Sequence, residues 1–365
     1  MKRPRVAIIG AGIFGISCAL ELADRCDVVI FEQNDDIMRG GTYGNQYRHH
    51  LGFHYPRSAA TVEQCLGAQD SFKSVWGESI DSQYPAYYAI AKAGTKISAN
   101  DFLNFCDQFK LSYQIEYPGE EWLNPEAVEL CIKTAEPIYN YPRLRTMAHN
   151  KIKATSGISL RLSSEVTSVK LLDNGIKQLE VLINKNVEEI SVDYVVNAMY
   201  TNHNLLYHWL GIPAPLLEFR LKELVVIKLP VDQSVAVTIM DGQFVTIVPM
   251  AEKGLFTLGD VGRSIHEISV SAHGQPWGRG EQVNKISHFP EMQEANPFFI
   301  PLIRSAEYVR SIFTVLPVRP NTTETDERTT TVTAHGHGCW SVFEGKIVTC
   351  VSFARQVAQE LLRGI

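Results

Sequence analysis

Three glycines near the N-terminus have the spacing of a phosphate-binding turn. Gly10, Gly12 and Gly15 form G-x-G-x-x-G between a short apolar run, residues 5–9, and a stretch with helical spacing, residues 13–23. In such a turn the first glycine permits a tight bend, the second lets a pyrophosphate approach the backbone, and the third lets helix and strand pack closely. The helix N-terminus then faces the phosphates. The pattern predicts a dinucleotide site.

An acidic residue lies where a dinucleotide-binding unit needs one. Glu32 ends a second apolar run, residues 27–32, and follows Gly10 by 22 positions. A carboxylate at this place accepts a hydrogen bond from a ribose 2′-hydroxyl and disfavours a 2′-phosphate. We therefore expect the ADP-ribose part of FAD or NAD, and not NADP. An NAD-dependent dehydrogenase is the alternative at this point.

The composition is that of a folded, enzyme-sized chain. It has 365 residues, 45% of them hydrophobic, and a formal net charge of −6 at pH 7. This acidic balance argues against a nucleic-acid or anionic-membrane surface, which would need a basic footprint. The seven cysteines include no C-x-x-C pair, which predicts free thiols in a reducing compartment and hence a cytoplasmic protein. No transmembrane segment and no metal site are expected, because apolar runs are short and metal-ligand spacings are absent.

The spacing of apolar residues divides the rest of the chain into helices and strands. Helices are expected at residues 58–76, from Ser98, from Asn124, after Pro142 and at residues 347–361. Strands are expected at residues 158–162, 166–172, 178–183, 194–197, 219–229, 235–240, 244–249 and 255–259. We expect residues 266–290 to form a long loop, and Gly364 to cap the final helix.

The segment after Glu32 resembles the D-amino acid oxidase superfamily of FAD-dependent oxidoreductases. That family follows its acidic residue with a Ser/Gly-rich loop ending in Asn and then a His-x-Gly stretch beside the flavin, and Asn45, His50 and Gly52 fit those places. Further similar segments are residues 141–144, 165–169, 195–198, 316–320 and 345–346. The chain departs from the family at residues 199–202, where a glycine is usual.

The resemblance implies FAD as the cofactor. The residues that it assigns to FAD binding are Gly10, Gly12, Ile13, Phe14, Gly15, Glu32, Gln33, Gly41, Thr42, Asn45, Gln46, His49, Val166, Ala198, Gly345, Lys346 and Ile347. The final helix would point at the flavin N1–C2=O edge, with Lys346 in its first turn. Its dipole and that charge would stabilise reduced flavin.

The resemblance also implies the reaction. A C–N bond of a small carboxylate-bearing substrate would be oxidised by hydride transfer to flavin N5, and O2 or another electron acceptor would reoxidise the flavin. Arg319 would hold the carboxylate with two hydrogen bonds, and His50, Tyr55 and Tyr141 would line the site. His50 could also act as a base or carry a covalent flavin bond. The weaker arginine candidates are Arg57, Arg220 and Arg279.

Two other functions stay open at this stage. One is oxidation of a 2-hydroxy acid or another alcohol by the same cofactor. The other is a flavin-binding protein without turnover. The sequence does not indicate an oligomeric state.

The expected fold class is α/β, with a Rossmann-type FAD-binding domain interleaved with an antiparallel-sheet α+β substrate domain. We assign residues 1–78, 140–212 and 314–365 to the FAD-binding domain. Residues 79–139 and 213–313 form the expected substrate domain.

Overall fold

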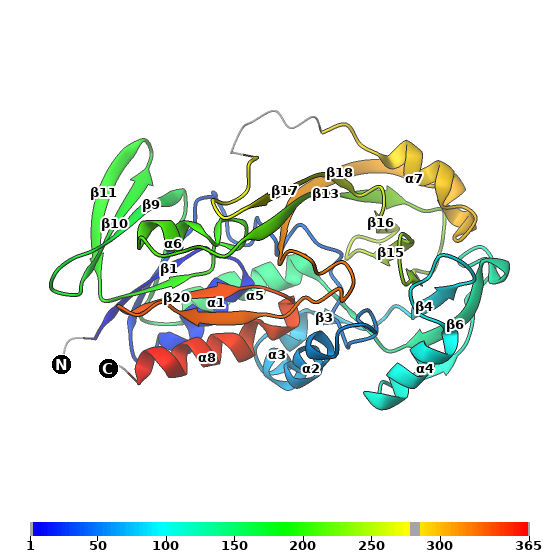
Figure 1. Cartoon of the computed structure of the whole chain (residues 1–365), viewed down its shortest axis with the longest axis horizontal. Coiled ribbons are helices and arrows are strands. Elements are labelled where there is room, and N and C mark those ends of the chain that lie inside the picture. The colour runs from blue at the N-terminus through cyan, green and yellow to red at the C-terminus, as the bar shows by residue number, and fades with distance from the viewer. Residues whose placement is uncertain (1–2, 278–284, 364–365) are drawn as a thin grey trace.

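The computed structural model describes residues 3–277 and 285–363. Its first sheet has six strands in the order β19-β20-β12-β1-β2-β8 (Figure 1). All except β19 run parallel to their neighbours. The bounds are β1 Arg5–Ile9, β2 Asp27–Phe31, β8 Ile158–Arg161, β12 Tyr194–Asn197, β19 Thr331–Ala334 and β20 Cys339–Phe343.

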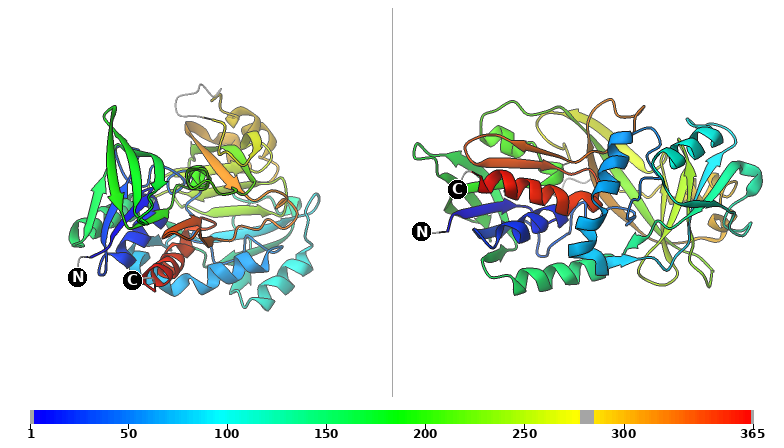
Figure 2. Two further views of the ribbon diagram at one scale, coloured as in Figure 1. Left: turned by 60° about the vertical axis from the view of Figure 1, so that its left-hand side comes forward. Right: turned by 90° about the horizontal axis from the view of Figure 1, so that it is seen from below.

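Helices cover this parallel sheet. Helix α1 (Ile13–Leu22) connects β1 to β2 and packs against α8 (Cys350–Leu362), although the two helices lie far apart in the sequence (Figure 2). Helix α5 (Tyr141–Ala154) also contacts α1. Strands of a parallel sheet are buried on both faces, which is why β1 and β2 consist of β-branched and other apolar residues.

The second sheet has nine strands and is mostly antiparallel. Its order is β17-β13-β16-β15-β14-β4-β6-β5, with β18 paired to the free side of β13, and only β14 and β4 run parallel. Buried and half-buried residues alternate along β13 from Leu217 to Lys222, and the strand is continuously buried from Glu223 to Ile227. The bounds are β4 Ala86–Ala91, β5 Tyr113–Ile115, β6 Val128–Thr134, β13 Leu217–Lys228, β14 Ala236–Met240, β15 Val245–Pro249, β16 Leu255–Asp260, β17 Ile265–Ser271 and β18 Glu307–Val318.

Smaller elements complete the fold. A three-stranded antiparallel sheet is formed by β9 (Ser164–Leu171), β10 (Lys177–Ile183) and β11 (Asn186–Val192), and β3 (Ile80–Asp81) pairs with β7 (Ile138–Tyr139). The other helices are α2 Ala59–Gly67, α3 Gln69–Trp76, α4 Ala99–Gln108, α6 Leu205–Trp209 and α7 Phe289–Ala295. Short 3-10 turns span Gly77–Ser79, Pro125–Ala127, Tyr200–Asn202, Pro301–Ser305 and Ile347–Thr349.

The expected fold class is confirmed, and three local expectations are wrong. The single helix expected at residues 58–76 is two helices that meet at Ala68. Asn124 caps only a 3-10 turn, which leads directly into β6. Strand β17 lies inside the expected loop, because Ile265–Ser271 pairs with β13. The expected cap, Gly364, is outside the described residues.

The two sheets draw on different parts of the chain. Every strand of the six-stranded sheet comes from residues 1–78, 140–212 or 314–365. The nine-stranded sheet comes from residues 79–139 and 213–313, apart from the end of β18, which continues to Val318. The domain boundaries themselves stay a prediction.

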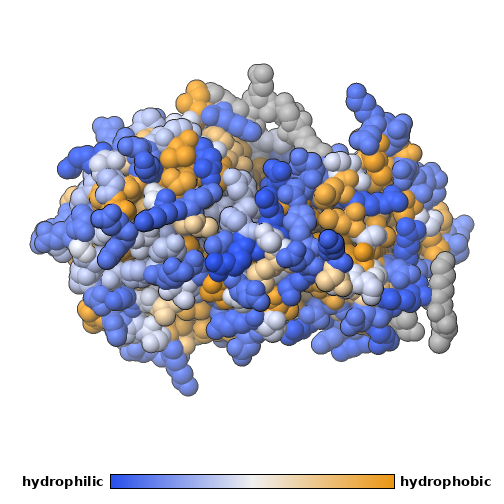
Figure 3. Space-filling view, turned by 180° about the vertical axis from the view of Figure 1, so that it is seen from behind, coloured by the Kyte–Doolittle hydropathy of each residue, from blue (hydrophilic) through white to orange (hydrophobic). Residues whose placement is uncertain are grey.

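The described ranges contain no helix that is both long and apolar enough to cross a bilayer. On the rear surface, hydrophobic patches lie between larger hydrophilic areas (Figure 3).

Candidate functional site

The glycine turn has the geometry that a dinucleotide site needs. Gly10 has φ of +106°, and a Cβ there would lie 2.4 Å from the Ala198 carbonyl oxygen. A Cβ on Gly15 would lie 2.0 Å from the Gly10 carbonyl oxygen. Both positions therefore exclude any side chain, one by conformation and contact and the other by contact alone.

The N-terminus of α1 is open toward a ligand. Gly12 is its N-cap and provides no side-chain hydrogen bond. A Cβ on Gly12 would have only one protein atom nearby, the Thr42 hydroxyl oxygen at 3.5 Å. The Ile13 backbone N–H donates to that hydroxyl at 3.1 Å. Few protein atoms cover this helix N-terminus, so a diphosphate group can approach its backbone N–H groups.

Glu32 lies directly after β2 and is held in place. One carboxylate oxygen accepts from the Ala11 backbone N–H at 2.9 Å, and the other accepts from the backbone and side chain of Asn34 at 2.9 and 2.7 Å. The side chain is buried beside the glycine turn. An acceptor fixed at the end of the second strand fits the ribose hydroxyls of an ADP group.

The loop after β2 is organised by Asn45. Its amide donates to the carbonyl oxygens of Gly41 and Thr42 at 3.0 and 2.8 Å, and its Oδ1 accepts from the Tyr47 backbone N–H at 2.6 Å. The next residue, Gln46, has a buried Nε2 with no partner within the described ranges. Asn45 thus shapes the loop.

Four cations gather between this loop, the nine-stranded sheet and the start of the final helix. We call Arg48, Lys222, Arg328 and Lys346 the cation cluster. Arg328 pairs with Asp326 at 2.7 Å. Within the described residues the other three form no ion pair, and the Lys346 Nζ instead lies 4.4 Å from the centroid of the Tyr55 ring.

The positive charges of the cation cluster lower the pKa values of its two lysines. Burial together with the charges of Arg328 and Arg48 lowers the pKa of Lys222 to about 8. Burial and the charge of Arg328 likewise lower the pKa of Lys346 to about 8. Arg48 is buried and bonds only to neutral groups, including His54 at 3.2 Å. A ligand anion would relieve this repulsion.

His50 is neutral and has a free ring nitrogen. Burial, with the charges of Lys346 and Arg48, lowers its pKa well below the ordinary value. Its Nδ1 is buried, has no hydrogen-bond partner among the described residues, and lies 3.6 Å from a carboxylate oxygen of Glu136. Burial raises the pKa of Glu136. A neutral imidazole with an unbonded ring nitrogen can accept a hydrogen bond from a ligand N–H or O–H group.

A comparison with known protein families decides the family of this chain. The sequence model of the FAD dependent oxidoreductase (DAO) family matches residues 5–273. The chain belongs to this family. It is an FAD-dependent oxidoreductase, and the turn at Gly10, the acceptor Glu32 and the open helix N-terminus at Gly12 fit the ADP part of that cofactor.

Solved structures of this fold resemble the oxidoreductase over its whole length. Glycine oxidase from Geobacillus kaustophilus has a TM-score of 0.75 at 16% identity, and the match covers 99% of this chain and 95% of that one. L-α-glycerophosphate oxidase from Mycoplasma pneumoniae, solved with FAD bound, has a TM-score of 0.72 at 15% identity, with 100% and 94% covered. At such identities the likeness shows the fold.

Two curated relatives are fungal. The FAD-dependent monooxygenase FPY4 of Fusarium mangiferae is 24% identical over 269 residues, which are 70% of this chain and 63% of that one. The FAD-dependent monooxygenase kojA of Aspergillus flavus is 36% identical over 108 residues, or 28% of this chain and 25% of that one. The match with this chain therefore covers 25% of the length of kojA and 63% of the length of FPY4.

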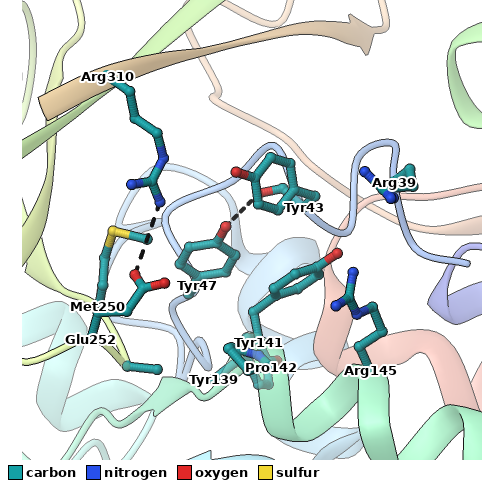
Figure 4. Close-up of a pocket in the computed structure, with 11 residues that line it drawn as sticks. Arg39, Tyr43, Tyr47, Tyr139, Tyr141, Pro142, Arg145, Met250, Glu252 and Arg310 are labelled. Atoms are coloured by element: carbon teal, nitrogen blue, oxygen red, sulfur yellow. Dashed lines mark hydrogen bonds and ion pairs between the residues drawn. The ribbon is translucent and has the colours of Figure 1, made fainter. Parts of the chain in front are cut away.

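Two of the expected substrate-site residues lie together in the oxidoreductase. The rings of His50 and Tyr55 are 5.3 Å apart between centroids, beside Lys346. Tyr141 lies elsewhere. Its hydroxyl donates to the Met38 carbonyl oxygen at 3.1 Å, and its ring lines a pocket of about 310 Å³ with three other tyrosines and with Arg310 and Glu252 (Figure 4).

Arg319 is not brought to this site. Its side chain is 47% exposed, reaches Thr331 Oγ1 at 3.1 Å and lies over the ring of Phe343. Arg57 and Arg220 are already paired, with Asp241 and Glu218 respectively. Arg279 is outside the described residues. That Arg319 holds the substrate carboxylate stays a prediction, and in this structure its side chain lies beside Thr331 and Phe343.

His49 contacts two other side chains. Its Nδ1 contacts the Tyr139 hydroxyl at 3.0 Å and its Nε2 contacts the Gln69 side chain at 2.6 Å. Both ring nitrogens are engaged in the packed interior, and a cofactor contact of His49 stays a prediction.

The remaining residues assigned to FAD have a range of exposures. Ile13 and Phe14 are buried in the first turn of α1, Val166 is buried on β9, and Ala198 is buried beside Gly10. Gln33 is exposed directly after Glu32. Gly345 lies next to the segment that precedes β19. A Cβ on Gly345 would be 2.1 Å from the carbonyl oxygen of Arg328 in that segment. Ile347 begins the 3-10 turn that leads into α8.

Sequence reasoning missed Arg48, Lys222 and Arg328. Lys222 had one visible signal: it is a charged residue in an otherwise largely apolar strand, between the buried residues Leu221 and Glu223. Strand alternation does not tell which face of a sheet meets a cofactor. Arg48 and Arg328 carried no such signal.

Proposed function

We propose that this protein oxidises a C–N bond next to the carboxylate of a small substrate. The observation that supports the proposal is the cation cluster beside a neutral histidine. Bound FAD supplies the hydride acceptor. The names of two similar structures, glycine oxidase and an L-proline dehydrogenase, concern substrates of this class.

The charge balance favours an anionic substrate. The cluster has four positive groups, and the one carboxylate paired to it is that of Asp326. Lys222 and Lys346 have pKa values near 8 and so are mainly protonated at neutral pH. Charged hydrogen bonds from such groups to a carboxylate are about twice as strong as neutral ones. The carboxylate would lie toward Lys222 and Arg328.

The proton of the substrate amine needs an acceptor. An amino acid is protonated at neutral pH, and its nitrogen must lose a proton before the C–N bond can be oxidised. The pKa of His50 is held well below its ordinary value, so this ring is too weak a base to hold that proton, and we assign the proton to solvent. His50 Nδ1 is unbonded, and we assign to it the acceptance of a hydrogen bond from the neutral amine.

A substrate panel read by anaerobic loss of flavin colour tests the proposal. Each amino acid is compared with the 2-hydroxy acid of the same carbon skeleton and with the amine that lacks the carboxylate. We expect reduction by an amino acid, and none by the amine. Faster reduction by hydroxy acids would replace C–N oxidation with alcohol oxidation. No reduction by any compound would favour flavin binding without turnover.

A further inference from the structure

One carboxylate oxygen directly after β20 is buried without a partner. It is Oε2 of Glu344, which has no hydrogen-bond partner among the described residues, and this holds for no other carboxylate oxygen there. The residue as a whole is half-buried, and its carboxyl group accepts from its own backbone N–H, yet burial still raises the pKa of the carboxyl group to about 8. A buried oxygen without a donor is unfavourable, so Oε2 points to a ligand that supplies one.

The fold places Glu344 at the edge of the sheet that carries the cofactor residues. Strands β1, β2, β12 and β20 are parallel, so their carboxyl ends share one edge. Gly10 follows β1, Glu32 follows β2, and Ala198 follows β12. Glu344 follows the fourth of these strands, β20, and therefore belongs to the same edge.

Tyr200 connects Glu344 to the loop after β2. Burial raises the pKa of the Tyr200 hydroxyl, and the nearby Glu344 charge raises it further. A Cβ on Gly41 would lie 2.6 Å from the Tyr200 ring. Tyr200 has φ of +50°, a conformation that side chains rarely adopt. Tyr200 therefore bridges the space between Gly41 and Glu344.

The residues on either side of Glu344 indicate which part of FAD it contacts. The N-terminus of α1 at Gly12 fits the diphosphate. Lys346, two residues after Glu344, belongs to the cation cluster near His50. Between its diphosphate and its flavin ring, FAD has only the ribityl chain. The Glu344 Oε2 lacks a donor, and ribityl hydroxyls can supply one, whereas the diphosphate oxygens and the flavin C2=O oxygen only accept hydrogen bonds.

We propose that Glu344 accepts hydrogen bonds from the ribityl hydroxyls of FAD, with Tyr200 covering the same stretch of the cofactor. The proposal depends on the FAD cofactor and not on the substrate proposed above. A wrong substrate class would leave the measurements below unchanged.

The test compares FAD with ADP, which lacks the ribityl chain. Flavin-free protein is titrated with each ligand, for the natural chain, Glu344→Leu and Glu344→Gln. We expect Glu344→Leu to bind FAD about 10-fold or more weakly and ADP as tightly as the natural chain. Glu344→Gln keeps one acceptor oxygen and should lose less. Glu63→Leu, an exposed position on α2, is the control and should change neither affinity.

Thermal unfolding gives a second measurement that needs no turnover. Glu344→Leu removes a buried carboxylate oxygen that has no partner, so the flavin-free variant should melt at a higher temperature than the natural chain. The rise in melting temperature on adding FAD should be smaller. An unchanged FAD affinity in Glu344→Leu would overturn the proposal. Equal losses of FAD and ADP affinity would also overturn it, because they would assign Glu344 to the nucleotide half.

Discussion

The glycines of the turn differ in what a side chain would meet, and that difference gives the first prediction. A Cβ at Gly12 has one protein atom at 3.5 Å, whereas a Cβ at Gly15 would lie 2.0 Å from a carbonyl oxygen. Gly12→Val should therefore fold normally and lose FAD, because the new side chain fills the space of the diphosphate. Gly15→Ala should fail to fold. Flavin content and circular dichroism distinguish the two, and a Gly12→Val protein with full FAD content would contradict the assignment.

The cation cluster gives a second prediction at the scale of single residues. Lys222→Met should weaken binding of a non-oxidisable carboxylate about 10-fold or more, since a charged hydrogen bond is lost. Arg319→Gln is the matched control and should have no effect, because Arg319 is half-exposed elsewhere. Perturbation of the flavin spectrum by the carboxylate measures both. An equal loss of carboxylate affinity in the two variants would show that Arg319 also contacts the carboxylate.

Protonation of the same lysine gives a pH dependence. The pKa of Lys222 is lowered to about 8, so the side chain is charged below that pH and neutral above it. Carboxylate affinity should be constant up to about pH 8 and fall at higher pH, because a neutral amine no longer attracts the anion. Lys222→Arg should make this fall smaller, since arginine stays charged while Lys346, whose pKa is also about 8, still loses its proton. A fall of the same size in both proteins would exclude Lys222 as a cause.

Residues near each other in the sequence could be predicted, and residues brought together by the fold could not. The roles of Gly10, Gly15 and Glu32 follow from a local spacing, and the structure gives them the expected geometry. Lys222 and Arg328 meet only because β13 and the segment after β18 converge. The contact between Arg319 and Thr331 likewise joins the end of β18 to β19, and no local spacing contains it.

At the scale of elements, a close contact between Gly345 and Arg328 joins the start of the final helix to the segment before β19. A Cβ on Gly345 would meet the Arg328 carbonyl oxygen at 2.1 Å, so Gly345→Ala must push the start of the final helix away from that segment. We expect a loss of stability of about 1–3 kcal/mol or more and loss of FAD. Gly67→Ala is the control, since nothing lies within 4 Å of its Cβ position. A melting temperature equal to that of the control would contradict this account.

Elements were predictable where a single periodicity covers them. Helix α8 repeats its apolar residues at three and four, and the structure buries that stripe. Strand β17 escaped prediction because its residues are half-exposed or exposed at a sheet edge, with only weak alternation. The helix expected at residues 58–76 divides at Ala68, which is the C-cap of α2 and the N-cap of α3. Gly67, the last residue of α2, marks this break, because glycine weakens a helix interior.

At the scale of the whole molecule, the cofactor site joins segments from the beginning, middle and end of the chain. Gly12, Gly41, Tyr200 and Lys346 all belong to it or border it. A ligand that binds only the folded state raises stability by mass action, by about 2.7 kcal/mol at 100 times its dissociation constant. Removing FAD should therefore lower the melting temperature of the entire chain in one transition. Two separate transitions, with only one of them sensitive to FAD, would contradict this.

The pairing of β20 with β12, and of α8 with α1, sets an order of events during synthesis. On the ribosome, β1 and α1 emerge first, and the whole nine-stranded sheet follows before β20 and α8 appear. Until then one edge of β12 and one side of α1 lack their partners. A growing chain therefore exposes an unpaired, apolar edge of β12 from residue 197 until β20 has been made, a condition that favours aggregation and engages chaperones. Flavin capture in the cell consequently follows the synthesis of β20 and α8.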